Sequence, residues 1–142
     1  EHEDIRCFHG PEGFVSALEI ADIAVLLLPS TPDTENMFNA SAFVQMPKGA
    51  VIINPGRGTL INDADLFASL DENHLAHATL DVFRIEPLPS DDLFWEHPKV
   101  TVTPHIASET RGSTAAEVIA ENIRRGEVGE PFLYQVDMTK GY

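Results

Sequence analysis

The hydrophobic residues of this chain fall into two patterns that alternate along its length. Short runs on consecutive positions are typical of strands covered on both faces of a sheet. Such runs occur at 24–28, 50–54, 78–82 and 100–103, with a weaker candidate at 5–8. Between the runs, hydrophobic residues recur at the spacing of an amphipathic helix. That spacing is found at 13–20, from a cap at Asn39 to Gln45, after a cap at Asn62 or Asp63, and at 108–125.

The alternation of strand and helix predicts an α/β fold, in which parallel strands are joined by right-handed crossovers. In an open parallel sheet, ligands bind beyond the carboxyl ends of the strands. The residues that directly follow each predicted strand are therefore the candidates for chemistry. They form short loops at 29–34, 55–58, 81–86 and 104–107.

Composition limits the class of partner. The 142 residues carry 9 basic and 23 acidic side chains, which gives a net charge of −14. Nucleic acids and anionic membranes are bound by dense positive charge, so neither is expected as a partner. No apolar run approaches the ~20 residues that span a bilayer. The single Cys7 excludes an internal disulfide and a thiolate zinc site, and indicates a reducing cytoplasm.

Arg57 lies between two glycines just after an apolar run, in the segment "INPGRGTL". Glycine removes the side chains that would crowd a neighbouring group. We interpret Gly56 and Gly58 as clearance around the guanidinium that leaves room for a bound ligand. The alternative is an ordinary surface arginine at a strand-to-helix turn, which needs no such clearance.

The segments "LPSTPDT", "INPGRGTLIND", "LDVFRIEPLP" and "TPHIAS" occur in the same order in the D-isomer-specific 2-hydroxyacid dehydrogenases. The chain resembles this family over nearly its whole length, and "FWEHPKVTVTPH" and "YQVDMTKGY" resemble its glyoxylate/hydroxypyruvate reductase A-like branch. The resemblance implies a Rossmann-like, doubly wound parallel sheet that here lacks its first strands and phosphate loop. Residues 1–107 are then the C-terminal part of a dinucleotide-binding domain, and 108–142 are a crossover helix and tail toward the substrate domain.

The same resemblance implies roles for three side chains. Reduction of a 2-oxo acid needs a hydride from a nicotinamide, a proton for the carbonyl oxygen and a group that holds the carboxylate. By resemblance, Arg57 holds the carboxylate, His105 donates the proton, and Glu86 is the carboxylate partner of His105. The plainer alternatives are a surface arginine, a histidine bonded to backbone and a solvated turn carboxylate.

NADP is the cofactor that the branch resemblance favours, with NAD as the alternative. Asp81 is expected to accept a hydrogen bond from the nicotinamide carboxamide, with a turn or helix cap as its alternative role. For Thr34, the alternative is to cap a proline-rich turn. No metal site is expected, since His74 and His77 have no third ligand near them in the sequence. The residues expected to contact the cofactor are Pro29, Thr34, Pro55, Gly56, Arg57, Asp81, His105 and Ala107.

We therefore expect an NAD(P)-dependent reductase of a small 2-oxo acid, glyoxylate or hydroxypyruvate, that is a homodimer in its complete form. One alternative is another branch of the family, of the phosphoglycerate or lactate type. Another is a non-catalytic dinucleotide-sensing module, in which His105 and Glu86 are dispensable. Because no Gly-rich phosphate turn precedes Ile23, the chain alone is expected neither to bind NADPH at micromolar levels nor to reduce glyoxylate.

Overall fold

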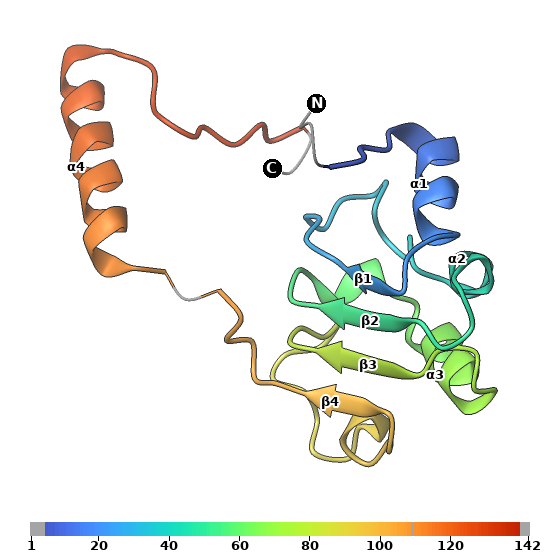
Figure 1. The fold of residues 1–142 in the computed structure, drawn as a ribbon. Helices are drawn as coiled ribbons and strands as arrows, with labels where there is room; N and C mark the ends of the chain where they lie inside the picture. The colour runs from blue at the N-terminus through green and yellow to red at the C-terminus, as the bar shows by residue number, and fades with distance from the viewer. Residues whose placement is uncertain (1–4, 109, 140–142) are drawn as a thin grey trace. The chain divides into compact units, whose positions relative to one another are not determined.

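Four parallel strands lie side by side in sequence order in the computed structural model, with their arrowheads pointing the same way (Figure 1). The structure describes residues 5–108 and 110–139, and the chain divides into two units, Glu1–His105 and Ile106–Tyr142. The strands are β1 (Ile23–Val25), β2 (Val51–Asn54), β3 (His77–Leu80) and β4 (Val100–Val102). Each overlaps the apolar run that predicted it, and the expected α/β fold is confirmed.

The hydrophobic core lies on one face of this sheet. The helices that contribute to it are α1 (Gly10–Leu18), α2 (Ala40–Gln45) and α3 (Asp63–Asp71). Because side chains alternate between the two faces of a strand, the register places Ala24, Ile52 and Ala78 in one row. Phe43 of α2 and Leu66 of α3 belong to the same cluster and are almost completely buried.

The opposite face of the sheet is open at β1. Ile23 is 59% exposed and Val25 is 52% exposed. The expectation that this strand is covered on both faces is therefore wrong for the residues that the structure describes. Leu26 belongs to the core and Ala24 packs against it, so the residues that alternate with them point away from α1, α2 and α3.

Asparagine caps determine where two of the helices begin. The side-chain oxygen of Asn39 accepts hydrogen bonds from the backbone N–H groups of Ser41 and Ala42, at 3.0 and 3.3 Å. The side-chain oxygen of Asn62 accepts one from the N–H of Asp65 at 3.1 Å. The expected cap at Asn39 is confirmed, and the choice between Asn62 and Asp63 falls on Asn62.

The structure corrects two further expectations. Residues 5–8 do not form one of the strands, and the guanidinium of Arg6 lies 4.7 Å from the centre of the Phe8 ring just before α1. The last helix, α4 (Gly112–Val128), begins after Ser108 and continues beyond Arg125, with Glu109 outside the described residues. It ends at Val128 because Gly129 adopts the left-handed conformation, with φ of 72°. None of the described helices is both long and apolar enough to cross a membrane.

The loop after β2 packs directly against the chain that follows β1 and the chain that follows β3. A Cβ atom at Gly56 would lie 2.7 Å from the carbonyl oxygen of Leu26. A Cβ atom at Gly58 would lie 2.1 Å from the carbonyl carbon of Phe83 and 2.5 Å from the backbone nitrogen of Arg84. Both obstacles are backbone, which no side-chain rotation can move. The two glycines therefore make room for neighbouring loops, a packing role that the sequence interpretation did not include.

We expect Gly58→Ala to destabilise the fold strongly, by about 3 kcal/mol, the upper end of the usual range for overpacking. The added methyl group must push the loop after β2 away from Phe83. The urea concentration at half-unfolding measures the effect. Gly112→Ala is the matched control, because among the described residues nothing beyond its chain neighbours and its own helix lies within 4 Å of a Cβ there. Equal midpoints for the two variants would contradict the close packing at Gly58.

Candidate active site

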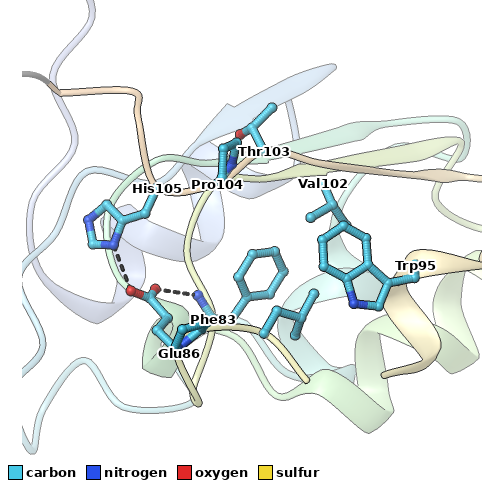
Figure 2. Close-up of a pocket in the computed structure, with 9 residues that line it drawn as sticks. Phe83, Glu86, Trp95, Val102, Thr103, Pro104 and His105 are labelled. Atoms are coloured by element: carbon cyan, nitrogen blue, oxygen red, sulfur yellow. Dashed lines mark hydrogen bonds and ion pairs between the residues drawn. The ribbon is translucent and has the colours of Figure 1, made fainter. Parts of the chain in front are cut away.

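His105 and Glu86 form a hydrogen-bonded pair where β3 and β4 give way to loops (Figure 2). The distance between His105 Nδ1 and Glu86 Oε2 is 2.7 Å. The other carboxylate oxygen of Glu86 accepts a hydrogen bond from the backbone N–H of Phe83 at 2.9 Å. The carboxylate is thus held on both oxygens, and Nε2 is the ring nitrogen of His105 that Glu86 does not engage.

The surroundings of Glu86 favour its charged form. The hydrogen bond from the Phe83 N–H lowers the pKa of Glu86 most, followed by the hydrogen bond to His105. Burial works in the opposite direction, while the charges of His105 and Arg57 lower this pKa further. Glu86 is therefore ionised at neutral pH, and its pKa lies below the ordinary value for a glutamate.

The backbone at His105 adopts an uncommon conformation. Its φ is 54°, in the left-handed region that non-glycine residues rarely occupy. Its side chain is 49% exposed, so burial does not account for this conformation. Strained backbone of this kind is often found at functional sites, where the surrounding structure holds it in place.

Arg57 projects from the loop after β2 and is exposed. Its Nη1 donates a hydrogen bond to the carbonyl oxygen of Gly56 at 2.6 Å. Because the Arg57 charge lowers the pKa of Glu86, the guanidinium lies within electrostatic reach of the His105–Glu86 pair. The structure thus brings together all three side chains that the sequence singled out, from loops that follow three different strands.

Asn54 holds the loop that carries Arg57. Its side chain is 1% exposed, its amide nitrogen donates to the carbonyl oxygen of Arg57 at 2.9 Å, and its side-chain oxygen accepts from the N–H of Gly56 at 3.1 Å. The backbone groups of this tight turn have no partners in a strand or helix. The buried side-chain amide of Asn54 supplies those hydrogen bonds instead. Sequence reasoning did not assign Asn54 a role.

Asp81 lies at the end of β3 and is 4% exposed. It accepts a hydrogen bond from the hydroxyl group of Thr103, which follows β4. A buried carboxylate is an acceptor that suits the N–H donors of a carboxamide. The chemistry of Asp81 therefore fits the nicotinamide end of the expected cofactor.

The other expected cofactor contacts lie in different settings. The hydroxyl group of Thr34 donates to the carbonyl oxygen of Pro29 at 2.7 Å and accepts from the N–H of Thr31 at 2.9 Å, so it closes its own proline-rich turn. Pro55 is half-buried in the loop that carries Arg57. Ala107 is exposed and belongs to the second unit.

An apolar pocket of about 450 Å³ extends from the His105–Glu86 pair. Figure 2 shows Trp95 and Val102 at the end of the pocket away from that pair. Phe83 lies between the two ends. The indole N–H of Trp95 donates to the carbonyl oxygen of Pro89 at 2.7 Å, which fixes one wall. Trp95 is not among the site residues expected from the sequence, yet it lines the same pocket as His105 and Glu86.

The remaining histidines of interest have structural partners. His74 Nε2 lies 2.8 Å from the carbonyl oxygen of Phe43, and His77 Nε2 lies 2.9 Å from the hydroxyl oxygen of Thr101. Over residues 5–108 and 110–139, no three His, Cys, Asp or Glu side chains gather in a way that could hold a metal ion.

Three comparisons place the chain among known proteins. The glyoxylate/hydroxypyruvate reductase A of Salmonella newport (strain SL254) is 40% identical over 138 residues, which cover 97% of this chain and 44% of that protein. The chain thus spans less than half the length of this relative.

Two crystal structures are similar in fold. A D-isomer specific 2-hydroxyacid dehydrogenase from Xanthobacter autotrophicus Py2, in complex with NADPH and MES, matches with a TM-score of 0.93 and 47% identity, over 99% of this chain and 58% of that one. An NADPH-dependent glyoxylate/hydroxypyruvate reductase from Sinorhizobium meliloti, in complex with NADP and sulfate, matches with a TM-score of 0.88 and 37% identity, over 94% of this chain and 44% of that one.

The sequence profile described as "D-isomer specific 2-hydroxyacid dehydrogenase, NAD binding domain" matches residues 6–107. These residues contain the whole parallel sheet together with Arg57, Glu86 and His105. The Rossmann-like α/β fold expected from the resemblance agrees with this match and with both crystal structures. The chain belongs to the family of D-isomer specific 2-hydroxyacid dehydrogenases.

Proposed function

We propose that this chain is part of an enzyme that reduces a small 2-oxo acid, glyoxylate or hydroxypyruvate, to the 2-hydroxy acid with NADPH. The observation that carries the proposal is the His105–Glu86 pair, 2.7 Å apart, with the Arg57 charge in reach of the same carboxylate. The relatives named glyoxylate/hydroxypyruvate reductase support the choice of substrate. The intact pair supports a catalytic role over a dinucleotide-sensing one.

The chemistry divides among the three side chains. A bound nicotinamide supplies the hydride that reduces the carbonyl carbon. Arg57 holds the substrate carboxylate, since its planar fork can donate two charge-assisted hydrogen bonds to the two oxygens. His105 donates the proton to the carbonyl oxygen through Nε2. Glu86 acts through His105: it binds Nδ1 and stabilises the protonated ring, so it is a positioning residue.

We propose that the cofactor lies over the carboxyl ends of β1, β2 and β3. Asp81 would accept a hydrogen bond from its carboxamide, and the backbone at Pro29 and at Pro55–Gly56 would contact it. Thr34 would keep the turn at Pro29 closed. The two neighbours that hold NADPH or NADP favour NADP over NAD. We assign His105 to the nicotinamide end of the site, and the cofactor contact expected for Ala107 stays a prediction.

The wider organisation is also a proposal. We infer that residues 1–107 contribute to the cofactor domain and that 108–142 continue toward the substrate domain. We infer further that the complete protein is a cytoplasmic homodimer. Family resemblance supports both inferences, and sedimentation equilibrium of the full-length protein tests the second.

Replacing His105 by alanine in the full-length enzyme should lower kcat for glyoxylate reduction by ~10²–10⁴, the usual scale for a positioned general acid. His77→Ala is the control, because His77 contacts Thr101 at the opposite, amino-terminal side of the sheet. Steady-state assays of NADPH oxidation measure both. If His105→Ala stays within a few-fold of the control, His105 is not the acid.

Replacing Glu86 by glutamine should move the alkaline fall of kcat/KM to lower pH. The pKa of Glu86 is lowered, so its negative charge is present across the neutral range, and the variant loses that charge beside the protonated imidazole. The pH–rate profile from pH 5.5 to 9.5, roughly spanning histidine titration, measures the shift. Glu96 is an exposed carboxylate that also lies between β3 and β4, and Glu96→Gln should leave the profile unchanged. Superimposable profiles for both variants would separate Glu86 from the acid.

Arg57→Lys should impair oxo-acid reduction strongly, because a point charge cannot reproduce the planar two-donor contact. Arg57→Ala should raise KM and lower kcat together, since both positioning and charge are lost. Arg124→Lys in α4 is the matched exchange at an exposed ion pair, and it should change neither constant. Unchanged constants in the Arg57 variants would mean that the carboxylate is bound elsewhere.

A further inference from the structure

Arg84 makes the widest set of contacts of any cation in the described part of the first unit, and none of the roles above uses it. It lies between Asp81 and Glu86 on the loop after β3, and its side chain is only 29% exposed. Its Nη2 donates hydrogen bonds to the side-chain oxygen of Asn36 and to the carbonyl oxygens of Thr59, at 3.2 Å, and Ile61.

Two carboxylates balance the charge of this guanidinium. Nη1 of Arg84 lies 3.7 Å from Glu35, and Nε lies 3.6 Å from Asp63 at the start of α3. Burial raises the pKa of Asp63, and the Arg84 charge works against that rise, while Asp92 adds to it. The two ion pairs are longer than a direct charge-assisted hydrogen bond, so Arg84 is fixed mainly by the three oxygens on Nη2.

These contacts connect the loops that follow three strands. Asn36 ends the turn after β1, Thr59 directly follows the Arg57–Gly58 pair after β2, and Arg84 itself follows β3. The N–H of Asn36 also donates to the carbonyl oxygen of Thr59 at 2.9 Å, so the first two loops are already joined. Arg84 connects the third loop to these two. That loop carries Glu86, which is hydrogen-bonded to His105.

We propose that Arg84 is a positioning residue that sets the spacing between Arg57 and the His105–Glu86 pair, and so between the groups that hold the substrate carboxylate and protonate its carbonyl. The inference rests on the proposed reduction of a 2-oxo acid. A side chain that holds loops in register has a kinetic effect, because a displacement of about 1 Å between reacting groups can lower the rate by roughly 10²-fold.

The test compares three variants of the full-length enzyme. Arg84→Met removes the donors and the charge but keeps a long side chain, and Arg84→Lys restores the charge. Lys99→Met is the matched control: Lys99 precedes β4 at the opposite end of the sheet, where it donates to the carbonyl oxygen of Leu70 and to Asn73 at 2.9 Å. The readouts are kcat and KM with glyoxylate and NADPH, the thermal midpoint, and amide hydrogen exchange of peptides covering 55–61 and 81–86.

Arg84→Met should lower kcat/KM by roughly 10- to 100-fold, with faster exchange confined to the two peptides, and Arg84→Lys should recover part of that loss. Lys99→Met should lower the thermal midpoint and leave the kinetic constants unchanged. The inference is overturned if Arg84→Met behaves like Lys99→Met, or if its exchange rises evenly over the chain. A wild-type enzyme that does not reduce glyoxylate or hydroxypyruvate refutes the proposed function, and the exchange data still decide whether Arg84 ties the loops.

Discussion

The close approach of two backbone segments, Gly58 against Phe83, is the constraint on which the site depends. The parallel register aligns Asn54 at the end of β2 with Leu80 at the end of β3, so the following loops leave the sheet side by side. Only a residue without a Cβ lets those loops touch. Their contact brings the charge of Arg57 within reach of Glu86, which lies on the other loop.

The site contains a positive side chain, Arg57, although the chain as a whole is strongly negative. With a net charge of −14, the chain as a whole repels an anionic substrate or cofactor. Arg57 is a local cation at the end of a strand. The two carboxylate oxygens of Glu86 are already hydrogen-bonded, one to the Phe83 N–H and the other to His105. A substrate carboxylate bound at Arg57 would therefore not lie next to an unpaired carboxylate of Glu86.

The sequence predicted where the four strands lie along the chain, the cap at Asn39, a cap at Asn62 or Asp63, and three side chains that the fold brings together. Those predictions depend on local periodicity, on cap chemistry and on the rule that loops at one edge of a parallel sheet converge. It did not predict the packing of Gly58, the buried turn amide of Asn54 or the contacts of Arg84, because these depend on segments far apart in the chain. The open face of β1 escaped prediction for a similar reason: an apolar run does not reveal what lies against it.

In the proposed reaction, Arg57 and His105 act on the carboxylate and the carbonyl oxygen of the same 2-oxo acid. A crystal structure of the full-length protein with NADPH and oxamate, an unreactive 2-oxo acid analogue, tests it directly. We predict that the oxamate carboxylate binds both donors of the Arg57 fork, and that its amide carbonyl oxygen lies about 3 Å from Nε2 of His105. Oxamate bound with its carboxylate away from Arg57, or with no oxygen within hydrogen-bonding distance of His105, would contradict the claim.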